Sequence, residues 1–508
     1  MRRLRSIAGG LAGAVGGVPP AGWLCALVAV MSGSAWALIA APFQVPDEPG
    51  HFAYTQYLAE AGEPPTNDRG AGPYSQEQLR VMDAMRYKQV QARTDNRPIT
   101  TRRAQRRLER ALKAPSSRRG EGGPTHASYN QPLYYALELI PYRLVPSANL
   151  FDRLYAMRLF SALLSGFTVL FAFLFLRELL PSTPWAWTVG ALAVALQPVF
   201  GNISGAIHSD NLLYFASAGV FLMLAVCFRR GLTPWRGAAL GAFAAAGLLA
   251  KPTMLGLVPG IALGVLLLLP RSNREERGAA IGGAVAAAAC AALPVIAYVL
   301  LNSEVWHRGE YFATGSDQTE GGSAQPASAT AAAASAKTLG GYLEYLWQFY
   351  LPRLPFMSDQ FDGYPVADVW FDGLVGRFGG LDYGFGTAVD AVAVVTYAVL
   401  ITLAGRELFR RRRSLGRRPL ELLTYGALAL GLLVAVHKAG YDNRTAEIQG
   451  FEQARYLFPL LALYAAVVAL AARGVGSRFG PAAGVLIVSL AIAQTMLALL
   501  LTLTRYYG

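Results

Sequence analysis

The most reactive side chains of the sequence follow its first apolar segment. Residues 43–65 read FQVPDEPGHFAYTQYLAEAGEPP, with Pro46, Asp47 and Glu48 where a helix would begin. Proline and acidic residues are favoured in the first turn of a helix. Asp47 and His51 are four residues apart, so a helix places both on one face. Two adjacent carboxylates at a membrane boundary could act as a general base or bind a cation, and a capped surface helix explains the spacing equally well.

Three further polar positions interrupt the apolar sequence. Asp210 lies in HSDN at the start of one apolar run, Lys251 lies in LLAKPTML between two runs, and Arg455 lies in FEQARYLFPL at the start of another. Each has an ordinary structural explanation, because aspartate caps helices well and long cations anchor helices at the membrane interface. A lysine at this depth is otherwise expected to be functional.

Together these residues could transfer a sugar from a lipid phosphate. A carboxylate must take the proton from the acceptor hydroxyl as it attacks the anomeric carbon. Cations must stabilise the phosphate, whose negative charge grows as it departs. The sequence supplies the acids and the bases for this reaction: Asp47, Glu48, Asp210, Lys251 and Arg455. The lipid tail stays in the bilayer, so the reaction has to occur at the interface.

Long apolar segments must position these residues. The chain has 508 residues, 54% of them hydrophobic and only 15% charged, whereas about a quarter of the residues of a soluble protein are charged. About 20 apolar residues cross a bilayer. The sequence has eleven candidate runs: 21–42, 159–176, 185–207, 211–228, 237–250, 252–269, 278–303, 384–405, 422–436, 456–472 and 479–504. The cysteines, Cys25, Cys227 and Cys290, lie inside such runs and imply neither a disulfide framework nor a metal cluster.

The basic residues predict the orientation of these runs. The net charge is +13, most of it from arginine. If the N-terminus is cytoplasmic and residues 131–142 do not span, most arginines of the short loops are cytoplasmic, as the positive-inside rule requires. Residues 131–142 then form an interfacial helix on the outer surface. We therefore expect a multi-pass plasma (inner) membrane protein with an uncleaved N-terminal anchor and an extracytoplasmic site.

This topology predicts three parts of the chain. Residues 1–303 form an N-terminal membrane module that includes a first outer loop, 43–157. Residues 304–383 form a second outer loop with an interfacial helix at 338–351, and residues 384–508 form the C-terminal transmembrane helices.

Two other segments of the outer loops have unusual composition. Residues 97–119 are strongly basic and could contact an anionic acceptor or lipid headgroups, although a solvated loop is the simpler interpretation. Residues 321–336 are of low complexity.

The motifs also support a family resemblance. PDEPGHFAY resembles the acidic motif of GT-C glycosyltransferases and is most similar to that of a branch of predicted membrane proteins, the DUF2142 family. The resemblance continues, in order, through YNQPLYY (129–135), RLFSALLSGFTVL (158–170), QPVFGNISGAIHSDNLL (197–213), AKPTML (250–255), GRFGGLD (376–382) and QARYLFPLLAL (453–463). It implies an all-α polytopic GT-C-like fold of about eleven transmembrane helices, with interfacial helices at about 47–61 and 129–145.

The resemblance also implies an activity. GT-C enzymes use polyprenyl- or dolichyl-phosphate sugars and usually invert the anomeric centre. Asp47 matches their catalytic base with Glu48 beside it, and Asp210 matches the second acid. Lys251 and Arg455 match basic residues at the carrier phosphate.

The partners follow from this activity. They are a polyprenyl-phosphate-linked sugar, membrane lipids and an extracytoplasmic glycan, lipid or protein acceptor, with no nucleic acid. Asp210, with His51, is expected to position the acceptor or a cation. A divalent cation could bind to Asp47, Glu48 and Asp210, and no other cofactor is expected.

Two other functions remain open from the sequence. A transporter or flippase of a lipid-linked or charged substrate would need ionisable residues or broken helices near the middle of the bilayer. The apolar runs carry almost no charge, and Asp390 lies near the end of its run. A non-catalytic scaffold gives no reason for acids and bases to gather on one side of the membrane. These observations favour chemistry at the outer surface.

Overall fold

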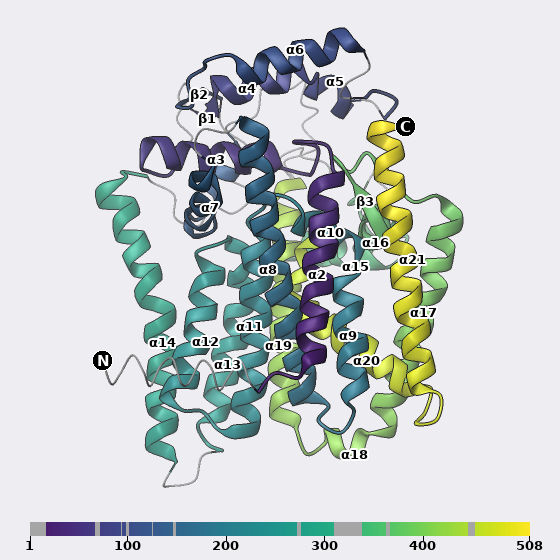
Figure 1. The fold of residues 1–508 in the computed structure, drawn as a ribbon. Coiled ribbons are helices and arrows are strands. Elements are labelled where there is room, and N and C mark those ends of the chain that lie inside the picture. The colour runs from purple at the N-terminus through teal and green to yellow at the C-terminus, as the bar shows by residue number, and fades with distance from the viewer. Residues whose placement is uncertain are drawn as a thin grey trace.

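Long helices run alongside one another and a layer of shorter helices covers one end of them in the computed structural model (Figure 1). The structure describes residues 17–66, 72–92, 94–97, 101–123, 125–145, 149–271, 276–308, 338–361, 366–444 and 453–508. The predicted low-complexity segment 321–336 lies outside these residues.

Each of the eleven predicted apolar runs coincides with helical structure. The corresponding elements are α2 (Pro20–Ile39), α8 (Leu150–Leu179), α9 (Pro184–Ala195) with α10 (Pro198–Ser204), α11 (Asp210–Arg230), α12 (Pro234–Leu248), η2 (Pro252–Leu257) with α13 (Val258–Leu268), α14 (Arg277–Leu300) continued by η3 (Leu301–Val305), α17 (Thr387–Arg410), α19 (Pro419–Arg444), η5 (Ala454–Leu460) with α20 (Leu461–Gly474), and α21 (Gly480–Tyr507). The chain is therefore a mostly helical, multi-pass membrane protein.

The predicted number of eleven spans is not confirmed. Within the described residues, 8 helices are long and apolar enough to cross a bilayer, and α9 with α10, which are bent by 62°, make up to 9. The 15 residues of α12 rise about 22 Å, which is less than the hydrocarbon thickness of about 30 Å. The helical segment Pro252–Leu268 is also shorter than a full span.

The bend between α9 and α10 has a local cause. Pro198 follows the end of α9 and is favoured in the first turn of a new helix. The side chain of Gln197 caps that helix by accepting a hydrogen bond of 2.6 Å from the backbone N–H of Phe200. All residues of α10 are buried, so this short helix lies inside the protein, next to α2 and α16.

The layer above the long helices comes mainly from the first predicted loop. It contains α3 (Glu48–Ala61), α4 (Gln76–Ala84), α5 (Tyr87–Ala92), α6 (Arg102–Lys113), η1 (His126–Tyr129) and α7 (Leu133–Leu144), with β1 (Gly72–Ser75) antiparallel to β2 (Gly120–Gly122). The helices expected at 47–61 and 129–145 are thus present as α3 and α7. Neither is long and apolar enough to span, as predicted for 131–142.

The basic segment forms the outermost part of this layer. In α6, Leu108 and Ala111 are buried while the arginines are exposed. Figure 1 shows α6 on the side of α3 that faces away from the long helices. Residues 98–100 of the predicted segment lie outside the described residues.

The second predicted loop supplies the remaining short elements. They are α15 (Leu339–Tyr350), α16 (Val366–Gly376), β3 (Arg377–Phe378) and β4 (Tyr383–Gly384), and β3 pairs with β4 antiparallel. A helix is present at the expected place, 338–351, as α15. The arginine-rich helix α18 (Arg412–Leu415) lies at the opposite end of the long helices from α3 and α6 (Figure 1).

Candidate active site

The first acid of the PDEP motif lies in a strained turn. Asp47 is the N-cap of α3 and has φ 62° and ψ −3°, in the left-handed region. A residue other than glycine pays roughly 1–2 kcal/mol for this conformation, so the surrounding structure must enforce it. The side chain of Asp47 is 50% exposed. The turn therefore presents a carboxylate that solvent or a substrate can reach.

The second acid points the other way and anchors the turn. Glu48 is fully buried and accepts two hydrogen bonds from Arg158, from Nε at 2.7 Å and from Nη2 at 2.6 Å. Its Oε2 also accepts from the backbone N–H of Phe43 at 3.0 Å. Arg158 donates further to the carbonyls of Ala37 and Ala40, at the end of α2. Glu48 thus ties the start of α3 to α2 and α8.

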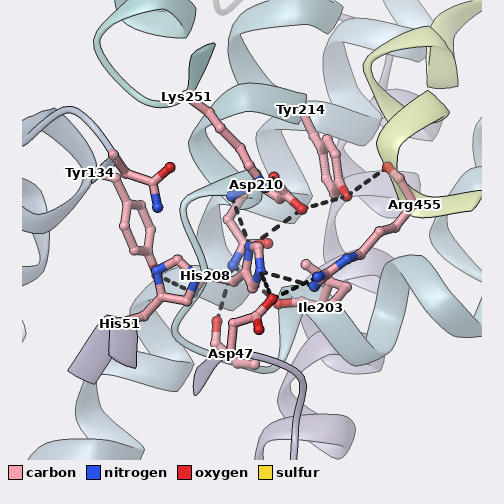
Figure 2. Close-up of polar contacts among 12 residues, drawn as sticks. Asp47, His51, Tyr134, Ile203, His208, Asp210, Tyr214, Lys251 and Arg455 are labelled. Carbon is pink, nitrogen blue, oxygen red and sulfur yellow. Dashed lines mark hydrogen bonds and ion pairs between the residues drawn. The ribbon is translucent and has the colours of Figure 1, made fainter. Parts of the chain in front are cut away.

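Arg455 and His208 face the carboxylate of Asp47. Arg455 Nη2 lies 2.6 Å from Asp47 Oδ2, and His208 Nε2 lies 3.7 Å from the same oxygen (Figure 2). The backbone N–H of Asp210 donates to His208 Nδ1 at 3.1 Å. Arg455 Nη1 also lies 3.0 Å from His208 Nε2, so each ring nitrogen of His208 faces an N–H donor.

A second acid–base pair lies on the other side of His208. Lys251 Nζ lies 2.6 Å from Asp210 Oδ1, and His208 Nδ1 lies 3.4 Å from Asp210 Oδ2. The hydroxyl of Tyr214 lies 3.3 Å from Asp210 Oδ2. Figure 2 shows Asp47 and Asp210 on opposite sides of His208. The ring of Tyr456 lies beneath both cations, 5.3 Å from Lys251 Nζ and 5.4 Å from Arg455 Cζ.

Burial and charge set the protonation of the groups outside the spans. Desolvation raises the pKa of Asp47, but the Arg455 guanidinium and the His208 imidazole outweigh it and hold that pKa well below its usual range. Burial lowers the pKa of His208, against the opposing influence of Asp210 and Asp47. Burial and His208 also lower the pKa of His51. Asp47 is therefore ionised at neutral pH, and both imidazoles are uncharged.

His51 belongs to the support of the site. Its ring centroid lies 4.3 Å from that of His208. Its Nδ1 lies 2.8 Å from the hydroxyl of Tyr135, and that hydroxyl accepts a hydrogen bond of 3.0 Å from the side-chain amide of Asn130. His51 is 2% exposed. It packs behind His208 and does not face the open side of Asp47.

The three acids do not form the shared cation site that the sequence suggested. Asp47 faces Arg455, Glu48 faces Arg158, and Asp210 faces Lys251. Across the part of the chain that the structure describes, no three His, Cys, Asp or Glu side chains are placed to hold a metal ion. The donor set of this arrangement thus does not fit a divalent cation.

Sequence reasoning missed two residues of this arrangement. His208 lies in the HSDN stretch beside the predicted acid, yet it received no role. Arg158 opens the quoted RLFSALL motif, and a charged residue in a long apolar helix signals a buried partner. That signal could have identified the Glu48 pair.

A hydrogen-bonded chain holds the backbone of His208. Its N–H donates to the hydroxyl of Tyr134 at 2.8 Å, and Tyr134 shares a hydrogen bond of 2.7 Å with Ser161. Ser161 donates to Glu138 Oε1 at 2.7 Å. Glu138 is fully buried, and desolvation raises its pKa from 4.5 to about 8. Glu138 is therefore mostly protonated at neutral pH.

Comparisons place the chain among membrane proteins. A family model described as "Predicted membrane protein (DUF2142)" matches residues 30–464. No curated protein matches the sequence. The chain is similar to the apo oligosaccharyltransferase of Archaeoglobus fulgidus, with 12% identity and a TM-score of 0.44. It is also similar to AglB of the same organism in complex with an inhibitory peptide and a dolichol-phosphate, with 13% identity and a TM-score of 0.47. Each match covers 96% of this chain and 56% of the other, so the chain spans a little over half the length of these structures.

Proposed function

The chain belongs to the DUF2142 family of predicted membrane proteins, and we propose that it is an inverting glycosyltransferase which moves a sugar from a polyprenyl-phosphate donor to an extracytoplasmic acceptor. The match to this family model confirms the predicted resemblance to DUF2142 proteins. One observation carries the proposed activity: the half-exposed carboxylate of Asp47 is ion-paired with Arg455 and lies near a second pair, Asp210 and Lys251. These groups lie where helices of the membrane-spanning bundle begin or end.

The proposed orientation puts this site outside the cytoplasm. The arginine-rich α18 and the layer formed by α3 and α6 lie at opposite ends of the long helices. Basic short loops favour the cytoplasmic side. We therefore assign the end with α18 to the cytoplasm and the Asp47 end to the outer surface.

Asp47 is the base in this proposal. An acceptor hydroxyl attacks the anomeric carbon of the donor from the face opposite the phosphate. The new bond joins the acceptor oxygen to that carbon, the proton passes to Asp47, and the carbon–oxygen bond to phosphate breaks with its electron pair on the phosphate oxygen. A single displacement of this kind inverts the anomeric centre.

Lys251 and Arg455 hold the phosphate in this proposal. Both cations lie over Tyr456, and each has a carboxylate partner in the donor-free structure. A lipid phosphate offers each cation a second anion, and charge-assisted hydrogen bonds to phosphate are strong. When Arg455 turns to the phosphate, Asp47 loses its main stabilising charge and becomes a stronger base. The donor thus activates the base that its transfer needs.

The remaining residues act through these groups. Burial of Glu48 against Arg158 suits a positioning role, because it fixes the turn that presents Asp47. His208 lies 3.7 Å from Asp47 and contacts Arg455 at 3.0 Å, and His51 packs behind it. Asp210 orients Lys251 and His208.

A comparison of cells with and without the protein tests the proposal. Lipid-linked sugars and envelope glycans are extracted from a deletion strain and from strains complemented with the wild type, with Asp47→Asn or with Glu109→Gln, an exposed acid of α6. The proposal expects a polyprenyl-phosphate sugar to accumulate and a glycan to shorten in the deletion strain and with Asp47→Asn alone. Full complementation by Asp47→Asn, at wild-type protein levels, would exclude Asp47 as the base.

A further inference from the structure

A cleft opens beside Arg455, next to the turn that carries Asp47. It is bordered by Pro46, by α10, by the β3–β4 region and by the start of η5, and it encloses about 410 Å³, including the part open to solvent. Pro46 precedes Asp47, and Arg455 both borders the cleft and binds that carboxylate. A ligand in this cleft is therefore next to the proposed base.

One face of α10 forms a wall of the cleft. Val199, Asn202 and Ile203 all border it, and their spacing places them on the same side of a helix. Leu381 faces the cleft from the turn between β3 and β4. The wall thus combines apolar side chains with one central amide.

Buried polar groups border the cleft. The side chain of Asn202 is almost fully buried, at 3% exposed. The buried Oε1 of Gln453 and Nε of Arg455 have no hydrogen-bond partner in the part of the chain that the structure describes. Buried polar groups are costly when unpaired. Two such atoms and the buried amide of Asn202 around one cleft point to a ligand with several hydrogen-bonding atoms.

The charges at the cleft are balanced. Arg455 is paired with Asp47, and Arg377 lies 3.8 Å from Asp372. The cleft therefore favours neither a strong anion nor a cation. Amide side chains both donate and accept, as hydroxyl groups do, and the apolar side chains suit the C–H faces of a sugar ring.

We propose that this cleft is the acceptor site and that it binds a neutral sugar unit of a glycan, with Asn202 and Gln453 hydrogen-bonded to its hydroxyls and one hydroxyl directed at Asp47. The protein then extends a glycan and does not modify a protein or a lipid. This inference rests on the proposed glycosyltransferase function. It adds the substrate class, and it separates an acceptor side with Asn202 from a donor side with Lys251.

Two probes separate the acceptor side from the donor side in the purified full-length protein. The first is a set of methyl glycosides of glucose, mannose, galactose and arabinose, followed by saturation-transfer NMR, with a short serine-containing peptide and a long-chain alcohol as competitors. The second is decaprenyl phosphate, followed by tryptophan fluorescence. The variants are Asn202→Leu, Gln453→Leu and a matched control, Gln105→Leu on the exposed surface of α6. Asn202→Ser replaces Asn202→Leu if the latter does not fold.

The wild type is expected to bind at least one glycoside, and both cleft variants are expected to bind it about tenfold or more weakly, because a site built to pair with hydroxyls loses those partners. The control should bind it normally, and all four proteins should bind decaprenyl phosphate equally. Three results would overturn the assignment of the cleft. The wild type binds no glycoside, the cleft variants bind it as tightly as the wild type, or the peptide or the alcohol displaces it. Failure of the wild type to bind decaprenyl phosphate instead counts against the proposed function.

Discussion

Replacing Glu48 with glutamine should destabilise the protein far more than the same change at the adjacent Asp47. Both oxygens of Glu48 accept hydrogen bonds, from Arg158 and from the backbone N–H of Phe43. Glutamine would place an NH2 group against one of these sets of donors and leave the charge of Arg158 unbalanced. Both side chains of the pair are fully buried. Breaking a buried ion pair on one side costs about 3–5 kcal/mol.

The matched variant Asp47→Asn should cost about 1 kcal/mol or less. The Asp47 side chain is 50% exposed, and ion pairs in contact with solvent contribute little. A loss of stability should still be measurable, because the lowered pKa of Asp47 means that the folded protein stabilises its anion. Substitutions of the two neighbouring acids are thus expected to affect different properties: stability for Glu48 and activity for Asp47.

The half-time of thermal inactivation in detergent, followed by the loss of monodisperse protein, measures the difference. Glu48→Gln should shorten it strongly and Asp47→Asn only slightly. The double variant Glu48→Gln with Arg158→Met should recover much of the loss, because no buried charge remains unpaired. Equal half-times for wild type and Glu48→Gln, or no recovery in the double variant, would refute the anchoring role of this pair.

Three further predictions concern the surroundings of the site. The pKa of Glu138 is about 8 in the folded protein, against an ordinary 4.5, so unfolding releases its proton between these two pH values. The stability that this group contributes is therefore complete below pH 4.5 and is lost as the pH rises toward 8. Glu138→Gln should outlast the wild type in thermal inactivation at pH 8, with the difference closing toward pH 5, and a difference independent of pH would count against a protonated Glu138. Lys251→Met should weaken binding of decaprenyl phosphate about 10- to 100-fold, as expected for a lost charge-assisted hydrogen bond, and unchanged binding would remove Lys251 from the donor site. Arg455→Gln should raise the pKa of Asp47 and move the acidic limb of the pH–rate profile for residual transfer to higher pH, whereas an unmoved limb would show that Arg455 does not tune this base.

Much of the fold could be predicted from the sequence, because bilayer thickness and apolar composition determine the long helices. All predicted runs coincide with helical structure, and α3 and α7 lie where the motifs implied. The number of spans could not be predicted in this way. Hydropathy does not show that Pro198 breaks a run into α9 and α10, or that α12 has only 15 residues.

The candidate site was predictable in its residues but not in its pairing. The sequence identified Asp47, Asp210, Lys251 and Arg455 as one group, and the structure brings them around His208. It could not show that Glu48 turns inward, because adjacent residues at a helix start point in different directions and the partner, Arg158, is 110 residues away.

The roles of the cleft amides were also beyond the sequence. Nothing in the sequence distinguishes Asn202 from other polar residues near apolar runs. Only the position of α10 beside the β3–β4 region and η5 brings it to the cleft with Gln453.

The release of lipid phosphate by the purified protein tests the central claim most directly. Wild type and Asp47→Asn are incubated with lipid-linked sugars and glycans extracted from the native membrane, and the lipid and glycan products of a single turnover are measured by mass spectrometry. The wild type should produce one polyprenyl monophosphate for each sugar added to a glycan. Asp47→Asn should be slower by a factor of about 100 or more, as expected for loss of a general base. Transfer at the wild-type rate by Asp47→Asn, or sugar addition without release of polyprenyl monophosphate, would contradict the mechanism.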